Sequence, residues 1–271
     1  MKLQFALVAG LMAALLWSSC EAAPILGPID IDVKLGEQTA AQISQNPRQY
    51  PILPESRYPE VYEYLNGIKQ AILDSGAVKY AEDFEWQLHV INDPDTLNAF
   101  ATPGGYIYIY TGLLFYLDGE DEIAGVLGHE IAHADLRHSM QQVRQERRRK
   151  VIGRLAGADQ DSLGQLLGLR HSRSDETEAD QASVTYLCGT DYNAAGAAGF
   201  FEKLDAEGGD EPPQFLSTHP SSDNRVEEIE DEVRLQGCTG VETYADRYSE
   251  MLETLPKQAA ERPRLRRLPR Q

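Results

Sequence analysis

The stretch "LGHEIAHAD", residues 127–135, decides how the rest of the sequence is interpreted. It carries His129 and His133 four positions apart, with Glu130 directly after the first histidine. Residues four apart lie on one face of an α-helix, so both imidazoles can reach a single metal ion. Two neutral imidazoles suit zinc, and the neighbouring carboxylate is placed to act as a general base. The stretch therefore predicts a helix with a site for one zinc ion per chain, although a helix histidine taken singly is usually structural.

A third metal ligand is expected further along the chain, in "DETEAD", residues 175–180. A catalytic zinc keeps three protein ligands and an open position for water. Glu176 lies in a predicted helix, and Asp180 follows four residues later on the same face. We expect Glu176 to be the ligand and Asp180 to accept a hydrogen bond from a ligand histidine. Glu178 is the competing ligand, but it has no acidic partner four residues on.

Three segments before the histidine helix have strand patterns and predict a small antiparallel sheet. They are residues 84–91, 97–102 and 106–112, separated by the turn sequences "NDPD" and "PGG". In "YIYIY" we expect Ile107 and Ile109 to pack inward and the tyrosines to lie at the surface. The other periodic segments are helical, so the predicted fold class is α+β and mostly helical. The predicted helices span residues 58–73, 120–150, 175–187 and 194–207, and a last helix is capped by Ser221 or Asp223 and runs to Gly237.

Four stretches together resemble the gluzincin zinc metallopeptidases. They are "NAFATPGGYIYIYTGLL" (98–114), "HEIAH" (129–133), "ETEAD" (176–180) and "HPSSDNR" (219–225). This family includes the heat-shock protease HtpX, the CAAX prenyl endopeptidase and the exported proteases BepA and LoiP. The resemblance runs from about residue 58 to 235 and implies a zincin-like metallopeptidase domain. The long apolar helices of the membrane-embedded members are absent from the sequence, so the resemblance is to the exported branch, soluble or lipid-anchored.

The resemblance adds two residues to the expected site. Glu176 and Asp180 match the glutamate and aspartate of the family's E-x-x-x-D pattern, and His219 and Arg225 match its H-P-x-x-x-x-R pattern. Both His219 and Arg225 would then line the catalytic cleft with Glu130. Arg225 would donate to the developing oxyanion or hold the carboxylates of the site. His219 would be a second donor, or would occupy the open zinc position in a resting state.

The resemblance also implies that the substrate is an extended or unfolded polypeptide. We expect the tyrosine-rich strand to be a sheet edge that such a chain can join by strand addition. The stretch near the zinc that is expected to contact substrate consists of Asn98, Ala99, Phe100 and Ala101. Exposed edges promote aggregation, so we expect a loop, residues 153–168 or 208–216, to cover this edge until substrate arrives.

The N-terminus has the pattern of an export signal. Lys2 precedes an apolar stretch, residues 5–17, which is too short to span a bilayer and is followed by "SSC". We favour a lipoprotein signal over residues 1–19, with Cys20 lipidated and the protein anchored to the outer membrane in the periplasm. The alternative is a soluble periplasmic protein cut after Ala22 or Ala23.

The remaining chain is expected to contain one domain with two flanking regions. Residues 20–55 are rich in proline and polar residues and predict a linker or an extended wrap, and residues 56–240 form the metallopeptidase domain. Residues 241–271 are expected to hold a C-terminal helix and a basic tail. Cys188 and Cys238 form an even pair once Cys20 is set aside, and in an oxidising compartment they favour a disulfide over two free thiols.

The expected function is a zinc-dependent endopeptidase of the bacterial cell envelope that cleaves unfolded or misfolded envelope proteins. The net charge of −18 argues against nucleic acid as a partner. One alternative is a non-proteolytic, zinc-binding chaperone or assembly factor for outer-membrane proteins, but a purely structural site needs no base at Glu130. Another is a metal-dependent hydrolase of esters or lipids, which would need a wider apolar pocket. The sequence indicates no oligomeric state.

Overall fold

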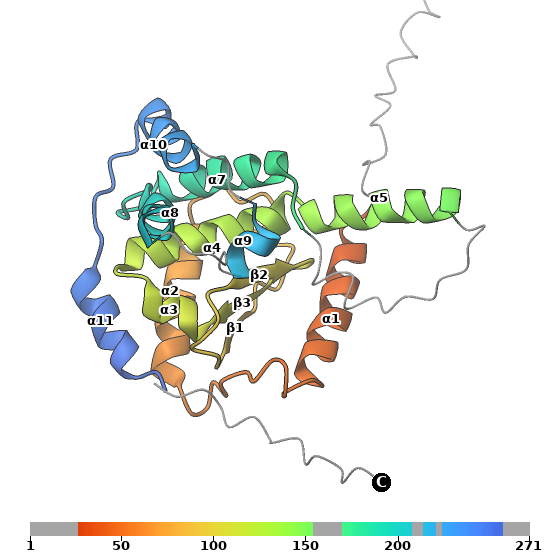
Figure 1. The fold of residues 1–271 in the computed structure, drawn as a ribbon, viewed down its shortest axis with the longest axis horizontal. Helices are drawn as coiled ribbons and strands as arrows, with labels where there is room; N and C mark the ends of the chain where they lie inside the picture. Colours follow the sequence, from red (N-terminus) through yellow and green to blue (C-terminus); the bar gives the residue numbers. More distant parts are fainter. Residues whose placement is uncertain (1–26, 154–169, 208–213, 221–223, 257–271) are drawn as a thin grey trace, which may run out of the picture.

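The computed structural model describes residues 27–153, 170–207, 214–220 and 224–256. The chain folds into a mostly helical arrangement around one small sheet, which confirms the predicted α+β fold class (Figure 1). The long helices are α1 (Asp30–Ser44), α2 (Pro59–Leu73), α4 (Glu120–Asp135), α5 (His138–Gly153), α7 (Arg173–Leu187), α8 (Gly196–Glu207) and α10 (Arg225–Gln236). Shorter helices are α3 (Thr111–Tyr116), α9 (Gln214–Thr218) and α11 (Ala245–Glu253).

Several predicted features lie outside the described residues. These are the signal over residues 1–19, Cys20, nearly all of the loop 153–168, the first part of the segment 208–216 and the basic tail from residue 257. Among the described residues, no helix is both long enough and apolar enough to cross a membrane.

The sheet is mixed, and in this respect the prediction of a wholly antiparallel sheet was wrong. It consists of β1 (Leu88–Ile91), β2 (Ala99–Thr102) and β3 (Tyr106–Tyr110), in the order β1-β3-β2. β2 and β3 are antiparallel, whereas β1 runs parallel to β3. The connection from β1 to β2 passes the end of β3, where the Gly112 N–H donates to the Asp93 carbonyl (3.1 Å). β1 and β2 therefore flank β3 and do not form a hairpin with each other.

The tyrosine-rich strand β3 is the central strand, so the predictions of a surface tyrosine face and of a β3 edge were both wrong. All five of its residues are buried. Helix α1 and the segment after it cover the tyrosine face, because Ile43 and Tyr50 pack into one cluster with the three tyrosines of β3. Residues 20–55 were predicted to be a linker or an extended wrap, but their described part consists largely of this helix. Gly36 allows the close approach, since a Cβ there would lie 2.0 Å from the Pro103 carbonyl oxygen.

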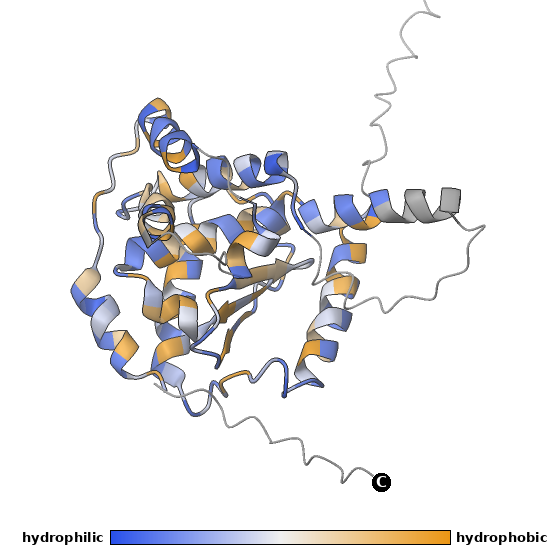
Figure 2. Ribbon diagram, viewed as in Figure 1, coloured by the Kyte–Doolittle hydropathy of each residue, from blue (hydrophilic) through white to orange (hydrophobic). Residues whose placement is uncertain are grey.

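Helix α4 runs through the middle of the molecule and carries the histidine motif. It packs against α7 and α8 on one side and against β2 on the other (Figure 1). Figure 2 shows the three strands mostly in hydrophobic colours, whereas α10 at the surface is mostly hydrophilic. The helix predicted over residues 120–150 is broken at Leu136 and Arg137, where Arg137 has a left-handed backbone (φ 61°). The chain then continues as α5.

Candidate metal centre

The motif helix α4 has little free surface because small residues let its neighbours approach closely. Nearly every residue of α4 is buried, including His129, Glu130 and His133. A Cβ on Gly128 would lie 2.4 Å from the Ser183 Oγ of α7. The close contact of α4 with α7 brings the acidic residues of α7 to the histidines.

The start of α7 is fixed by a capping box. The Ser172 Oγ accepts from the Asp175 N–H (3.1 Å), and the Asp175 carboxylate accepts from the Ser172 N–H (3.0 Å). Glu176 and Asp180 follow in the first two turns, one turn apart on one face. Both side chains are buried against α4.

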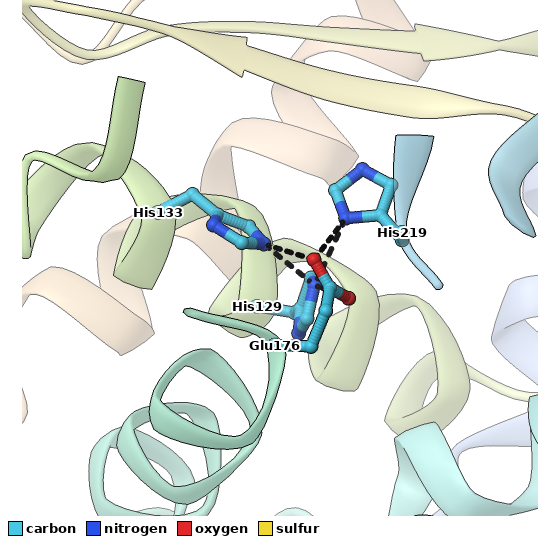
Figure 3. Close-up of side chains that lie close together, drawn as sticks. All are labelled: His129, His133, Glu176 and His219. Atoms are coloured by element: carbon cyan, nitrogen blue, oxygen red, sulfur yellow. Dashed lines mark hydrogen bonds and ion pairs between the residues drawn. The ribbon is translucent and has the colours of Figure 1, made fainter. Parts of the chain in front are cut away.

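Four side chains converge on one point from three parts of the chain (Figure 3). They are His129 and His133 from α4, Glu176 from α7 and His219, which follows α9. Each is at most 3% exposed. The distances from His129 Nε2 are 2.9 Å to His133 Nε2, 3.3 Å to His219 Nδ1 and 3.4 Å to Glu176 Oε2. The Glu176 Oε1 lies 3.3 Å from His133 Nε2 and 3.2 Å from His219 Nδ1.

These separations fit a tetrahedral metal site. Ligands placed about 2.0–2.1 Å from a zinc ion at the corners of a tetrahedron lie roughly 3.3–3.4 Å from one another. Three imidazole nitrogens and one carboxylate oxygen are also ligand types that zinc accepts. The donor set therefore fits a divalent metal ion in both chemistry and spacing.

The carboxylate of Glu130 is buried beside this cluster and has no hydrogen-bond partner in the part of the chain that the structure describes. The side chain of Glu130 is 1% exposed, and neither oxygen has a hydrogen-bond partner among the described residues. The His219 Nε2 lies 3.5 Å from Glu130 Oε1. A buried carboxylate without partners is costly to fold, so such a group normally has a functional reason.

Asp180 and Arg225 support the cluster from outside it. Asp180 Oδ1 lies 2.8 Å from His129 Nδ1, and Arg225, the first residue of α10, donates to both Asp180 oxygens (2.8 Å each). The Arg225 Nη2 also lies 3.1 Å from Glu176 Oε2. This geometry matches the second predicted role of Arg225, that of holding the carboxylates.

The electrostatics keep the two carboxylates ionised. Burial raises the pKa of Glu176, but hydrogen bonds to His129, His133 and His219 outweigh it and hold the pKa well below its usual range. Burial also raises the pKa of Asp180, but Arg225 and His129 outweigh it and lower the pKa. Burial lowers the pKa of His129, yet Asp180 and Glu176 raise it to about 9. In the metal-free centre, the two ionised carboxylates are therefore paired with His129 and Arg225.

His219 reaches the cluster from a short segment whose backbone bonds to two other parts of the chain. Its ring stacks on Phe215 of α9 (centroids 4.4 Å apart), and the Phe215 N–H donates to the Leu97 carbonyl just before β2 (3.1 Å). The Thr218 carbonyl accepts from the His171 N–H (3.0 Å). His219 Nδ1 thereby becomes the fourth member of the cluster.

Other predicted site residues lie near the centre or support it. Ala99, Phe100 and Ala101 belong to the edge strand β2, which contacts α4, and Asn98 directly precedes this strand. Cys188 and Cys238 form a disulfide that joins the C-terminal ends of α7 and α10. Glu178, the competing ligand, is 57% exposed at its side chain and does not belong to the cluster.

Two histidines that the sequence did not single out also contact the centre. His138 Nδ1 lies 2.9 Å from His133 Nδ1, and the ring of His171 stacks on that of His133 (centroids 3.8 Å apart). The break after α4 brings His138 back to His133, and nothing in the spacing of the histidines indicates this. His171 could have been suspected only from its place directly before the capping box of α7.

A buried helix with H-E-x-x-H and a glutamate from a second helix form the ligand arrangement of a metallopeptidase centre. The comparison with protein families agrees, because the model of peptidase family M48 matches residues 62–233. The chain therefore belongs to peptidase family M48.

Relatives in this family come from bacteria and mitochondria. The mitochondrial metalloendopeptidase OMA1 of Schizosaccharomyces pombe is 39% identical over 178 residues, 62% of this chain and 52% of the relative. A putative beta-barrel assembly-enhancing protease of Vibrio cholerae is 28% identical over 198 residues, 65% of this chain and 40% of the relative. The metalloprotease YcaL of Escherichia coli is 32% identical over 149 residues, 51% of this chain and 58% of the relative. The matches thus span about half the length of these relatives.

Proposed function

We propose that this protein is a zinc-dependent endopeptidase that cleaves extended or unfolded polypeptides. The observation that carries the proposal is the buried carboxylate of Glu130, which has no hydrogen-bond partner among the described residues and lies beside four metal-ligand atoms. A structural metal site would have no use for such a group. A general base that accepts a proton from a water molecule explains this carboxylate.

The roles of the residues follow from their positions. His129, His133 and Glu176 would hold the ion, which when bound would polarise the scissile carbonyl and lower the pKa of a coordinated water to about 7. Glu130 accepts the proton of the attacking water and returns it to the leaving amine. Asp180 orients His129, and Arg225 keeps Asp180 and Glu176 in place.

The described state is a resting one. His219 Nδ1 stands at the fourth corner of the cluster, where water and the substrate carbonyl must bind. His219 must therefore leave before catalysis. The short segment that carries it is attached through Phe215 to the residue before Asn98, so a substrate that docks on β2 can displace it.

The edge strand β2 is the proposed substrate-binding element. The Tyr110 N–H donates to the Asn98 carbonyl (3.0 Å), so the alternation of the antiparallel ladder directs the backbone groups of Ala99 and Ala101 away from β3. Those of Ala101, which is partly exposed, can pair with an extended chain, whereas Ala99 is buried in this state and must be uncovered first. Such pairing is recognition through backbone hydrogen bonds with little dependence on sequence. Unfolded polypeptide is the class of substrate that such an edge fits.

The proposed location is the bacterial cell envelope, with the protein anchored to the outer membrane through a lipid on Cys20 and acting on misfolded envelope proteins. The disulfide between Cys188 and Cys238 supports an oxidising compartment. Mass spectrometry of the mature N-terminus tests the anchor. An acylated Cys20 is expected, and a free N-terminus after Ala22 or Ala23 would contradict the anchor without affecting the proposed activity.

Replacement of the base tests the proposed chemistry. Glu130→Gln keeps the shape of the side chain but cannot accept the proton, so we expect casein cleavage to fall at least 100-fold while zinc content stays at one ion per chain. The measurement pairs zinc analysis with casein degradation, and Glu178→Gln serves as a control that should cleave like the wild type. Wild-type cleavage rates in Glu130→Gln would refute the proposed role.

A further inference from the structure

Both histidines of the motif direct one ring nitrogen, Nε2, inward to the four-residue cluster, and the other, Nδ1, outward, away from it. The outward nitrogen of His129 contacts Asp180, as described above. The outward nitrogen of His133, Nδ1, lies 2.9 Å from the Nδ1 of His138. His138 is fully buried, and its other nitrogen, Nε2, lies 3.4 Å from the Glu178 carboxylate. His138 thus occupies the position at His133 that Asp180 occupies at His129.

This contact exists only because the helix breaks after His133. On a continuous helix His138 would lie five residues on, about 140° around the axis, and could not meet the outward face of His133. Arg137 supplies the break with its left-handed backbone (φ 61°), an uncommon conformation for a residue other than glycine. Asp135, at the end of α4, accepts from the backbone N–H groups of Lys79 and Tyr80 and so fixes the last turn.

The side chain of Arg137 bonds to the N-terminal helix α1 and so links it to the break between α4 and α5. Its Nε donates to Asp32 Oδ1 (2.9 Å), its Nη2 donates to Asp32 Oδ2 (2.5 Å), and its Nη1 donates to the Gly27 carbonyl (3.0 Å). Asp32 belongs to α1 and is 1% exposed, so this ion pair is buried. A buried pair with several hydrogen bonds holds its geometry firmly. The backbone that presents His138 is therefore held by a part of the chain far from the motif in sequence.

We propose that His138 is a positioning residue of the metal centre, which accepts a hydrogen bond from His133 Nδ1 and so keeps His133 Nε2 directed at the metal ion. The inference rests on the proposed function, because it assumes that His133 binds the ion. A neutral imidazole that binds metal through Nε2 carries its proton on Nδ1, and this buried N–H needs an acceptor. The Nδ1 of His138 is that acceptor, and His138 then carries its own proton on Nε2, towards Glu178.

A second metal site at His133, His138 and His171 is the competing explanation, since their ring nitrogens also lie close together. This trio contains no carboxylate, and the lone pair of neutral His133 is already directed at the first cluster. A second ion would require His133 to lose both protons. The positioning role needs no such change.

The test measures zinc affinity by competition with a chromogenic chelator, in the full-length protein. His138→Leu removes the acceptor, and we expect its zinc affinity to fall 10- to 100-fold, the range typical for loss of a partner of a ligand histidine. His138→Gln retains an acceptor and should recover most of the affinity. His89→Leu, a histidine of β1 outside the centre, is the matched control and should bind zinc like the wild type.

Urea unfolding with a chelator present separates positioning from packing. If His138→Leu loses metal-free stability but binds zinc as tightly as the wild type, His138 is only structural and the proposal is overturned. Loss of a second equivalent of zinc in this variant would overturn it in favour of the second site. A wild type that binds no zinc would instead contradict the proposed function itself.

A measurement on the wild type keeps the inference testable if His138→Leu does not fold. In zinc-bound protein labelled with ¹⁵N-histidine, we expect NMR to find His133 protonated at Nδ1 and His138 protonated at Nε2 alone. A proton on the Nδ1 of His138 would exclude the acceptor role.

Discussion

Under the proposed function, His219 distinguishes a resting metal centre from a catalytically competent one. Its Nδ1 lies 3.2 Å from Glu176 Oε1 and 3.3 Å from His129 Nε2, and its ring is stacked on Phe215. Three ligands remain without it, which is the number that a catalytic zinc needs. At the scale of single residues, the proposed activity would therefore depend on how easily this imidazole leaves.

Removal of His219 should activate the protein. In His219→Ala the fourth corner is open to water and substrate, so we expect casein cleavage to rise several-fold while one zinc ion per chain remains bound. Initial rates and zinc content are measured together, with His89→Ala as the control. A fall in rate to that of Glu130→Gln would mean that His219 acts on the substrate, as a donor to the oxyanion.

The site residues that could be predicted are those whose partner lies one helical turn away in the sequence. His129 with His133, and Glu176 with Asp180, are four residues apart, and helical spacing alone places each pair on one face. His138 is different, because its contact depends on the left-handed Arg137, which in turn depends on Asp32. No local sequence pattern predicts a backbone conformation that a distant ion pair stabilises.

At the scale of elements, the site depends on how closely α4 is packed. A Cβ on Gly125 would lie 2.4 Å from the backbone nitrogen of Ala197 in α8, and one on Gly128 would meet Ser183 in α7. These glycines stand inside a helix, where glycine is unfavourable by about 1 kcal/mol relative to alanine. The close approach of three helices compensates for that cost.

Gly125→Ala should therefore destabilise the protein although alanine is the better helix former. The added methyl group must push the backbone of α8 away, and overpacking of this kind costs about 1–3 kcal/mol. The matched control is Gly67→Ala in α2, where a Cβ meets nothing within 4 Å. We expect the control to gain about 0.5–1 kcal/mol.

Urea unfolding of both variants measures the two changes in the free energy of unfolding. Equal stability changes for Gly125→Ala and Gly67→Ala would show that α4 and α8 are not tightly packed at this point.

The hydrophobic periodicity of the sequence predicted the amphipathic helices. It did not predict helices whose buried face is determined by contacts with distant parts of the chain. The apolar repeat of α2 is clear in the sequence, and the helix ends close to its predicted bound. Helix α1 was missed because its buried positions include Asp32, Gly36 and Thr39, which do not form an apolar repeat. The burial of Asp32 and Gly36 is explained by Arg137 and by the turn between β2 and β3, which lie far away in the sequence.

At the scale of the whole molecule, Glu120 joins distant elements at the start of α4. It is 1% exposed and accepts hydrogen bonds from Tyr64 of α2, Tyr192 before α8 and Arg247 of α11. Burial raises the pKa of Glu120, but the hydrogen bonds from Arg247, Tyr192 and Tyr64 outweigh it and hold the pKa below the ordinary 4.5. A carboxylate at a helix N-terminus is also favoured by the helix dipole.

This network predicts a pH-dependent stability. A group with a lowered folded-state pKa stabilises the fold above its unfolded-state pKa, and the contribution is lost as the pH falls through the folded value. We expect Glu120→Gln to be less stable than the wild type by about 1.5–3 kcal/mol at pH 7, with the difference shrinking below about pH 4.5. Urea unfolding between pH 7 and pH 3 measures it, and a difference that does not change with pH would contradict the assignment.

The fold class was predictable because the helical and alternating segments are distinct, but the strand order was not. The sequence "YIYIY" alternates as a strand with one polar face would, yet β3 is central and its tyrosines are buried under α1. A tyrosine can satisfy either environment, since its ring is apolar and its hydroxyl is polar. Only the position of the N-terminal helix decides between them.

The zinc content of two neighbouring glutamate variants tests the central claim most directly. Glu176 belongs to the ligand cluster, whereas Glu178, two residues on, is exposed and outside it. We predict one zinc ion per chain in the wild type and in Glu178→Gln, which keeps an acceptor for His138, and almost none in Glu176→Ala after dialysis against a weak chelator. Zinc retained by Glu176→Ala at the wild-type level would contradict the metal centre on which the proposed function rests.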